Sequence, residues 1–398
     1  MAVSDPAAPP EALPVVVVGA GPAGLAVAGA LARRGVRATL LEAGEAPGAS
    51  WRRHYPFLRL HTTRRDSSLP GRPMPGGGDR YPGRDEYARY LEDYARWLGA
   101  DVRTGREVVG VRRRDGAWEV EARGGEEPWP LRARHAVIAA GFNRRPVRPE
   151  LPGEEAFGGP VLHSSRWHEL GEVAGRRVLV VGLGNTGADL VEELHRAGAR
   201  VAVAVRGPVH LVPLEVAGIN WRTWYRLVPG LAFAAGRLGG PPLRRLAPRA
   251  AAAFWCAIAR ARFGDLEGRG LRLQRAGELV AHWGARRPPL TSGPFVEAIR
   301  RGGVEVLPAL AGLEPGAALL ADGGRHPCDA VVLATGFRPA LEELLPPEAL
   351  PEPGGWPPDG RPGPLPGLWF CGYLPEVLRI RRSARRLARR VAADLAGR

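Results

Sequence analysis

A glycine-rich turn near the start of the chain combines residues that can bind the phosphates of a nucleotide. The apolar run Val15–Val18 predicts a buried parallel strand. In the G-x-G-x-x-G spacing that follows, the first glycine makes a tight turn and the second lets the backbone approach a pyrophosphate. The third lets the next helix, expected over residues 22–34, pack on the strand and direct its N-terminal N–H groups at the phosphates. The expected contact residues are Gly19, Gly21, Pro22, Ala23 and Gly24.

The second predicted strand of this unit ends in an acidic residue, Glu42. A carboxylate at this place can accept a hydrogen bond from a ribose 2′-hydroxyl, and it would repel a 2′-phosphate. The first motif therefore predicts a dinucleotide that lacks a 2′-phosphate.

The same pattern occurs a second time, after the apolar run Val178–Val181. Here the second strand ends in Arg206, which follows Gly182 by 24 residues, much as Glu42 follows Gly19 by 23. An arginine at the position that matches Glu42 suits the 2′-phosphate of NADP. We therefore expect FAD at the first motif and NADPH at the second. The expected contact residues of the second motif are Gly182, Gly184, Asn185, Thr186, Gly187 and Arg206.

The composition favours a globular protein over a nucleic-acid binder. The 398 residues are 45% hydrophobic, which is enough for two or three domain cores. The formal charge is +15, yet the chain contains no lysine, so all 56 basic residues are arginine. We interpret them as scattered, solvated side chains and expect no nucleic-acid partner.

The three cysteines, Cys256, Cys328 and Cys371, are far apart and form no C-x-x-C pair, so the sequence predicts neither a redox disulfide nor a metal site. Sparse cysteine use fits a reducing compartment, and the N-terminus lacks a signal-peptide pattern. We expect a cytoplasmic protein without an integral membrane span. Weak peripheral contact with a membrane and a homodimer stay open.

The order of these patterns predicts an α/β fold with two Rossmann-like dinucleotide-binding domains, in which the NADPH domain is inserted into the FAD domain. We expect a flexible tail over residues 1–14 and an FAD domain over residues 15–150 and 325–398. The NADPH domain is expected over residues 151–324. Within it, residues 214–285 are expected to cover the substrate. A helix over residues 84–100 and a hairpin that turns at Asp115-Gly116 are expected in the first domain.

Further motifs link the chain to a known family. The stretch "FGGPVLHSSRW" has the pattern F-x-G-x-x-x-H-x-x-x-[Y/W], and "SWRRHYPFLRLHT", "YPGRDEYARYLEDYA", "GNTGADLVEEL" and "LATGFRP" are also family-like. With these motifs the chain resembles the flavin-containing monooxygenases, particularly the plant YUCCA-type branch and its bacterial relatives. The resemblance extends from Val15 to about Tyr373, and the segment 214–285 contributes little to it.

The resemblance implies a reaction in which NADPH reduces FAD, oxygen forms a C4a-hydroperoxyflavin, and one oxygen atom passes to a small organic substrate. N- or S-oxygenation and YUCCA-like oxidative decarboxylation of a 2-oxo acid are both implied. It also implies that Trp51 and Arg52 flank the flavin or its pyrophosphate, with core packing as the alternative for Trp51. Further candidate residues are Asn143 and His163 as catalytic groups, and Ser164 and Gly336 at the cofactors. For His163, a structural role that fixes the linker is the alternative, and Asn143 could instead merely turn the chain.

Other functions stay open at this point. The chain lacks an asparagine between Trp51 and Pro70, and its closing "GYLPEVLRIRRSARRLA" departs from the family's glycine-rich run. These departures allow an NADPH-dependent flavin oxidase or reductase, and a Baeyer–Villiger monooxygenase or a non-catalytic FAD- and NADP-binding protein are further alternatives. Six aromatic side chains are expected either to line an apolar substrate pocket, to dock on a membrane, or to pack in core helices: Trp221, Trp224, Tyr225, Phe233, Phe254 and Trp255.

Overall fold

The computed structural model describes residues 12–125, 129–224, 227, 240–284, 289–291, 293–351, 356–373 and 377–397. The chain divides into two compact units, one made of Met1–Arg145 with Arg338–Arg398 and the other of Pro146–Phe337. Each unit combines parallel strands with helices, so the predicted α/β fold is confirmed.

The first unit is built on a seven-stranded sheet with the order β3-β2-β1-β6-β5-β4, and β19 also pairs with β6. The first half of β6 pairs with β5 in antiparallel fashion, and its second half pairs with β19 in parallel. The strands are β1 (Leu13–Val18), β2 (Thr39–Leu41), β3 (Asp101–Arg103), β4 (Glu107–Arg114), β5 (Ala117–Arg123), β6 (Leu131–Ile138) and β19 (Leu368–Phe370).

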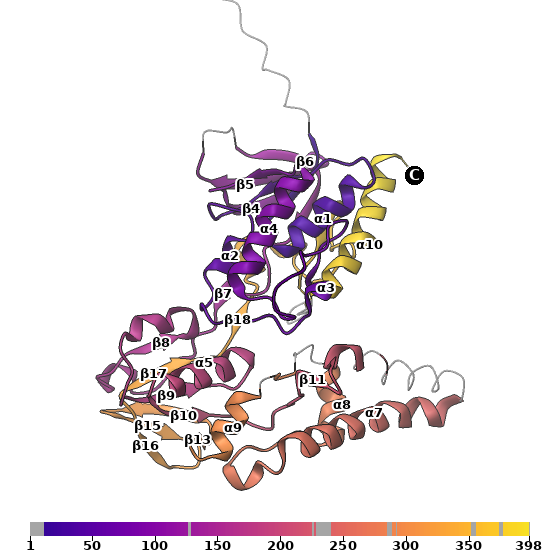
Figure 1. Cartoon of the computed structure of the whole chain (residues 1–398). Helices are drawn as coiled ribbons and strands as arrows, with labels where there is room; N and C mark the ends of the chain where they lie inside the picture. The colour runs from indigo at the N-terminus through magenta and orange to yellow at the C-terminus, as the bar shows by residue number, and fades with distance from the viewer. Residues whose placement is uncertain are drawn as a thin grey trace, which may run out of the picture. The chain divides into compact units, whose positions relative to one another are not determined.

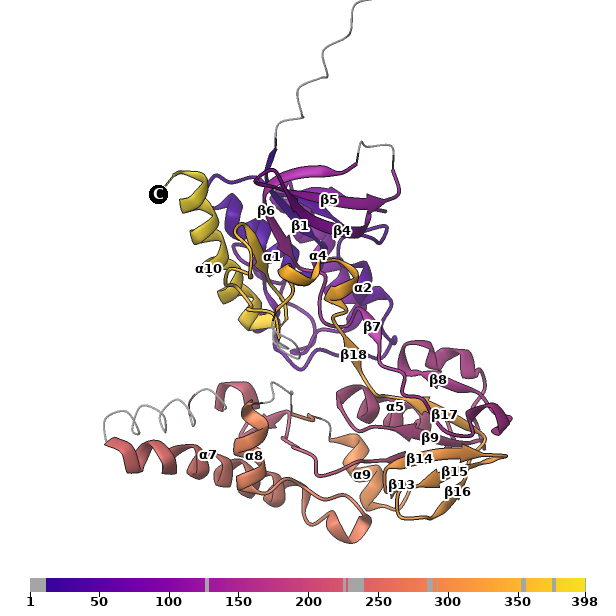
Figure 2. The ribbon, with the colours of Figure 1, turned by 180° about the vertical axis from the view of Figure 1, so that it is seen from behind.

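Alternating side chains of β1 supply two separate cores. Val15 and Val17 pack against the helices on one face, whereas Val16 and Val18 pack on the other face against Trp118 and residues 341–350. This is the period of two that a strand buried on both faces requires. Figure 1 shows α1, α4 and α10 side by side on the first face, and Figure 2 shows the opposite face.

The helices of the first unit are α1 (Pro22–Ala32), α2 (Ala49–Arg52), α3 (Arg64–Ser67), α4 (Arg84–Leu98) and α10 (Val377–Leu395), with short turns η4 (Leu341–Glu343) and η5 (Pro347–Ala349). The helix expected over residues 84–100 is thus confirmed as α4, which ends at Gly99 in a left-handed backbone conformation. The hairpin is confirmed as well. Asp115 and Gly116, both with positive φ, join β4 to β5, as a two-residue type I′ turn requires.

The second unit is built on a five-stranded, fully parallel sheet with the order β13-β10-β9-β17-β8. A three-stranded antiparallel sheet, β14-β15-β16, packs through Leu313, Ala318 and Leu320 on one face of it. The strands are β8 (Val161–His163), β9 (Arg177–Val181), β10 (Arg200–Ala204), β13 (Val304–Leu307), β14 (Leu310–Glu314), β15 (Ala317–Leu320), β16 (Arg325–Pro327) and β17 (Ala330–Leu333), together with the short pair β11 (Glu215–Val216) and β12 (Ile219–Asn220).

The helices of the second unit are α5 (Asn185–Arg196), α7 (Gly240–Phe263), α8 (Ala276–Gly284) and α9 (Pro294–Arg300), with short turns η1 (Glu154–Ala156), η2 (Ser164–Leu170) and η3 (Glu267–Arg269). α7 and α8 share a small core of their own that contains Trp221, Trp255 and Leu279. None of the helices within the described ranges is long and apolar enough to cross a membrane.

The chain passes between the units at β7 (Arg145–Pro146) and β18 (Phe337–Arg338). These crossings differ from the expected domain boundaries at residues 150/151 and 324/325. The larger difference arises because β17 pairs with β8 and β9, which places residues 325–337 in the second unit rather than in the first.

Candidate functional site

The first glycine loop, between β1 and α1, has the geometry that a nucleotide-binding turn needs. Gly19 has φ +100°, and a Cβ on it would lie 2.8 Å from the Ala139 carbonyl oxygen, at the end of β6. A Cβ on Gly24 would lie 1.9 Å from the Gly19 oxygen, so only glycine allows this contact between α1 and the turn. Around Gly21, by contrast, a Cβ would meet nothing within 4 Å.

The second glycine loop, between β9 and α5, repeats this geometry. Gly182 has φ +100°, and a Cβ on it would lie 2.8 Å from the Ala334 oxygen, at the end of β17. A Cβ on Gly187 would lie 2.2 Å from the Gly182 oxygen, and again nothing lies within 4 Å of one on Gly184. Each loop thus has two glycines required by the fold and one beside open space.

The open space lies at the start of a helix in both loops. Gly21 and Gly184 are the N-cap residues of α1 and α5, and neither helix has a side-chain cap. The N–H groups of a first helical turn have no intrahelical acceptor, and together with the helix dipole they attract an anion. The middle glycines and the uncapped helix starts therefore fit a pyrophosphate at each loop.

Glu42 directly follows β2, and its buried carboxylate faces the first loop. Oε2 accepts a hydrogen bond from the Ala20 N–H at 2.8 Å, and Oε1 accepts one from the Gly44 N–H at 3.0 Å. Each carboxylate oxygen can accept a second hydrogen bond. The side chain is therefore fixed beside the loop and retains capacity for a ribose hydroxyl.

The backbone register corrects the expected match between Glu42 and Arg206. The Gly19 N–H donates to the Leu41 oxygen at 2.7 Å, and the Gly182 N–H donates to the Ala204 oxygen at 2.9 Å. The residue equivalent to Glu42 is therefore Val205, and Arg206 lies one position further on. Arg206 is exposed, and the described residues give its guanidinium no hydrogen bond or ion pair. The second loop thus replaces the acid by a neutral residue and adds a cation next to it.

The side chain of Asn185, the first residue of α5, is held by another part of the second unit. Its Nδ2 donates to the Pro289 oxygen at 3.2 Å, and its Oδ1 accepts from the Thr291 N–H at 2.9 Å. The side chain of Asn185 is thus held by residues 289–291, while its backbone lies in the first turn of α5. Thr291 carried no recognisable signal in the sequence, because its role depends on a contact across more than one hundred residues.

His163, at the end of β8, is buried, and both of its ring nitrogens have partners. Nδ1 accepts from the Ser165 N–H at 3.2 Å, so the ring proton is on Nε2, which donates to the Gly336 oxygen at 3.0 Å. Burial lowers the pKa of His163, although the hydrogen bond to Gly336 opposes this, so the ring is neutral near pH 7. The Gly336 oxygen also accepts from the Val147 N–H at 2.9 Å. The geometry therefore favours the alternative in which His163 fixes the chain near the crossings.

Trp51 and Arg52, on α2, contact α4. The Trp51 ring lies edge-on to Tyr87 with 4.7 Å between ring centroids, and the Arg52 guanidinium forms an ion pair with Glu92 at 2.5 Å. Trp51 is partly buried against the core of the first unit, which agrees with the packing alternative.

Asn143, Ser164 and Gly336 differ in their surroundings. Asn143 is exposed, between β6 and β7, and Ser164 is buried at the start of η2. Gly336 has φ +85° and is the acceptor for His163 described above. Asn143 belongs to the first unit, whereas the other two belong to the second.

Asp359, a residue that the sequence analysis did not single out, organises the loop after β19. Its Oδ1 accepts from the Gly372 N–H at 2.6 Å and from the Tyr373 N–H at 3.1 Å, and its Oδ2 accepts from the Ser383 hydroxyl on α10. A Cβ on Gly372 would lie 2.5 Å from the Ala23 Cβ, so this loop packs against the first turn of α1. Asp359 thus helps to shape the phosphate end of the first loop.

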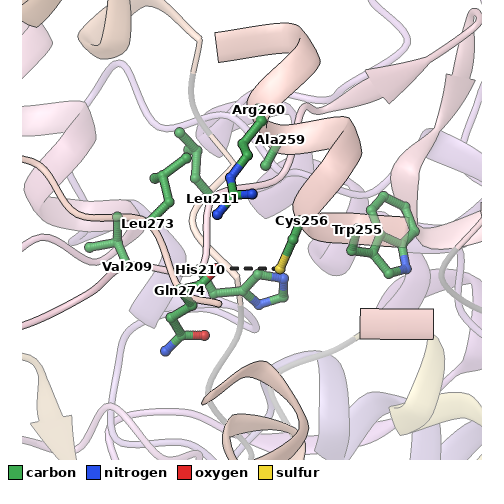
Figure 3. Close-up of a pocket in the computed structure, with 9 residues that line it drawn as sticks. All are labelled: Val209, His210, Leu211, Trp255, Cys256, Ala259, Arg260, Leu273 and Gln274. Atoms are coloured by element: carbon green, nitrogen blue, oxygen red, sulfur yellow. Dashed lines mark hydrogen bonds between the residues drawn. The ribbon is translucent and has the colours of Figure 1, made fainter. Parts of the chain in front are cut away.

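The segment 214–285 contains core rather than an open aromatic pocket in its described part. Trp221 and Trp255 are at most 2% exposed and share a core with Trp224, whereas Phe254 is exposed. Tyr225 and Phe233 lie outside the described residues. A pocket of about 10 Å³, room for about one water molecule, lies between α7 and the strand-like residues 209–211 (Figure 3). The described residues contain no group of three or more side chains placed to hold a metal ion.

Comparisons with known proteins agree with two nucleotide loops on one chain. Residues 16–213 match the model of the pyridine nucleotide-disulphide oxidoreductase family. The indole-3-pyruvate monooxygenase YUCCA1 of Oryza sativa subsp. japonica is 34% identical over 83% of this chain and 78% of its own length. The indole-3-pyruvate monooxygenase YUCCA6 of Arabidopsis thaliana is 30% identical over 96% and 89%, respectively.

Solved structures show the same fold. A flavin-containing monooxygenase from Stenotrophomonas maltophilia aligns with a TM-score of 0.71 and 25% identity, over 96% of this chain and 98% of its own. A cyclohexanone monooxygenase from Rhodococcus sp. Phi1 bound to NADP+ aligns with a TM-score of 0.70 over 98% and 85%, at 20% identity. These structures cover both units of the chain.

Proposed function

The chain belongs to the YUCCA-type flavin-containing monooxygenases, and from that premise we propose that it oxygenates a small 2-oxo acid. It is an NADPH-dependent flavin monooxygenase, and its cofactors are FAD and NADPH. The observation that carries the assignment of the two cofactors is the pair of glycine loops, which have similar geometry but different residues after the second strand of each unit. Glu42 follows β2 beside the first loop, and Val205 and Arg206 follow β10 beside the second loop.

We assign FAD to the first loop and NADPH to the second. At the first, the start of α1 and Gly21 would hold the pyrophosphate, and Glu42 would accept a hydrogen bond from the adenosine ribose. At the second, Gly184 and the start of α5 would hold the pyrophosphate, and Arg206 would bind the 2′-phosphate. The neutral Val205 supports this assignment, because a carboxylate there would repel the phosphate.

FAD, when bound, supplies hydride acceptance from NADPH and the activation of oxygen. The residues of the chain bind and orient the cofactors. Asp359 fixes the loop against the first turn of α1. His163 and the Val147 N–H both donate to the Gly336 oxygen, near the two crossings. The neutral His163 ring donates a hydrogen bond from its Nε2–H group to the Gly336 oxygen, so we assign it a positioning role. Asn143 is exposed and is a candidate substrate or cofactor ligand.

The names of the plant relatives indicate the substrate class. They act on indole-3-pyruvate, a 2-oxo acid, and we propose a substrate of this type for the present chain. In the balanced reaction, the 2-oxo acid, O2, NADPH and a proton give the acid that is one carbon shorter, CO2, water and NADP+. N- or S-oxygenation of another small molecule is the second candidate within the same family.

Labelled oxygen tests this proposal directly. The purified, FAD-loaded protein is mixed with NADPH, 18O2 and indole-3-pyruvate, and the product is analysed by mass spectrometry. We expect one 18O atom in the shortened acid and one NADPH consumed for each product molecule. Hydrogen peroxide does decarboxylate 2-oxo acids, so a parallel reaction contains catalase. If catalase abolishes the product, or if only amines or sulfides acquire the label, the 2-oxo acid proposal is wrong.

The proposal includes a cytoplasmic location and a homodimer. The three cysteines are free thiols, as is usual in a reducing compartment. Light scattering during size-exclusion chromatography of the purified protein measures the assembly, and a mass near 43 kDa would exclude the homodimer.

A further inference from the structure

The side chain of Asn185 connects the start of α5 to a distant segment, residues 289–291. Besides its bonds to Pro289 and the Thr291 N–H, it accepts a hydrogen bond from the Thr291 hydroxyl at 3.3 Å. Thr291 is 3% exposed and Asn185 is half-buried, so these bonds are partly shielded from water. Because Gly184 is the N-cap residue, Asn185 is not needed as a cap, and its side chain is committed to this segment.

Residues 289–291 form one edge of a short parallel ladder. We call it the tether ladder and define it as residues 209–212, 272–274 and 289–291. The Leu290 N–H donates to the His210 oxygen at 2.8 Å, and the Val212 N–H donates to the Leu290 oxygen at 2.9 Å. Residues 209–212 are the middle segment and also pair with residues 272–274. The Val209 N–H donates to the Arg272 oxygen at 3.0 Å, and the Gln274 N–H donates to the Val209 oxygen at 2.9 Å.

The tether ladder in turn contacts α7. The pocket in Figure 3 is enclosed by ladder residues, among them His210 and Gln274, and by α7 residues, among them Cys256 and Arg260. The Cys256 thiol donates to the Gln274 oxygen at 3.3 Å. A continuous set of contacts therefore leads from the glycine loop through Asn185 and the tether ladder to α7, all within the second unit.

We propose that Asn185 is a positioning residue that couples NADPH binding to the order of the tether ladder and α7. This inference rests on the proposed function, because it needs NADPH at the second glycine loop. A pyrophosphate held by the first turn of α5 restricts the backbone of Asn185, and the direction of its side chain then restricts residues 289–291. Coupling of this kind is reciprocal, so an ordered tether ladder also strengthens NADPH binding.

Hydrogen exchange of the FAD-loaded protein, with and without NADP+, tests the coupling. In the unaltered protein NADP+ is expected to slow exchange at the ladder amides of Val209, Val212, Gln274, Leu290 and Thr291. In Asn185→Ala this slowing is lost, and the Kd for NADP+ rises about 10-fold, within the usual range of such couplings. FAD content stays unchanged, because the first glycine loop is in the other unit.

Thr291 provides a milder pair of variants in case Asn185→Ala does not fold. Thr291→Val removes the hydroxyl bond to Asn185 and is expected to raise the Kd for NADP+ about two- to three-fold. Thr291→Ser keeps the hydroxyl and is expected to bind NADP+ with the Kd of the unaltered protein. The matched control is Thr223→Val, at an exposed threonine of the same unit, which leaves the Kd and the exchange pattern unchanged.

The outcomes separate this inference from the proposed function. If NADP+ binds the unaltered protein but protects the tether ladder equally in Asn185→Ala, the coupling is wrong and the proposed function stands. The coupling is also wrong if Thr291→Val and Thr291→Ser bind NADP+ with the same Kd. If the unaltered protein does not bind NADP+, the proposed function fails, and the inference fails with it.

Discussion

At the scale of single residues, Arg206 is the side chain expected to select NADPH over NADH. It is exposed and follows Val205, so its guanidinium is available for a 2′-phosphate. Arg206→Ala is expected to raise the KM for NADPH about 10- to 100-fold, the loss of one or two charge-assisted hydrogen bonds, and to leave the KM for NADH nearly unchanged. Flavin reduction measured with each nucleotide checks this, with the exposed Arg200→Ala as control. Equal losses with both nucleotides would contradict the assignment.

Val205 gives a second prediction at this scale. Val205→Glu places a carboxylate at the position equivalent to Glu42, where it would repel the 2′-phosphate and accept from a ribose hydroxyl. We expect kcat/KM to fall at least about 10-fold for NADPH and to stay equal or rise for NADH. Val205→Gln is the uncharged control. A matching loss with the glutamine variant would show that size, rather than charge, is responsible.

The residue register also shows what the sequence could not provide. The tight turn was predictable, because its glycines lie within a few residues of one another, and the place of Glu42 was predictable, because it stands at the end of the next strand of the same unit. The sequence could not show that Val205, rather than Arg206, is the equivalent of Glu42. That register depends on which carbonyl oxygen accepts from the N–H of Gly19 and of Gly182. Nor could the sequence show the bond between Asn185 and Thr291, because it joins residues that only the tertiary fold brings together.

At the scale of elements, the two kinds of glycine in each loop should respond differently to the same substitution. Gly21→Ala meets open space and ordinary backbone angles, so the Tm of the FAD-free protein should fall by no more than about 1–3 °C, the modest cost of alanine at a helix N-cap. FAD affinity should nevertheless fall markedly, because the methyl group occupies the space of the pyrophosphate. Gly24→Ala forces α1 away from Gly19 and should lower the Tm itself.

Thermal unfolding and FAD titration of the two variants check this prediction. Gly184→Ala is the matched variant of the second loop and should weaken NADP+ binding without changing FAD affinity. A large drop of the Tm in Gly21→Ala would mean that this glycine serves the fold rather than a ligand.

Elements with strong local signals were predictable from the sequence. The amphipathic pattern of α4 and the Asp115-Gly116 turn each specify their structure within a short window. The aromatic residues of the segment 214–285 gave no such information. A tryptophan suits a pocket and a core equally well, and only the packing of α7 on α8 places Trp221 and Trp255 in a core.

At the scale of the whole molecule, three buried or half-buried histidines make the fold sensitive to mild acid. Burial lowers the pKa of His54, His135 and His163 below the ordinary value of 6.5. The unfolded chain therefore binds more protons than the folded one below about pH 6.5, and stability that is complete above this pH is lost as the pH falls. Each histidine contributes a slope of at most about 1.4 kcal/mol per pH unit.

Unfolding of the protein in denaturant at several pH values between 7.5 and 5.5 checks this prediction. The free energy of unfolding should fall over this range, before most carboxylates are protonated, and His163→Gln should make the decline shallower. A stability that is constant down to pH 5.5 would mean that the three rings are protonated equally in both states.

The tether ladder also has a consequence for how relatives of this chain can diverge. It closes the excursion between Val212 and Leu290 at its base, so the glycine loop is anchored to the ladder and not to the tip of the excursion. Within the excursion, α7 and α8 pack on a core of their own, so changes of chain length elsewhere in it need not disturb the ladder. Insertions and deletions should therefore accumulate in this excursion during evolution without altering nucleotide binding.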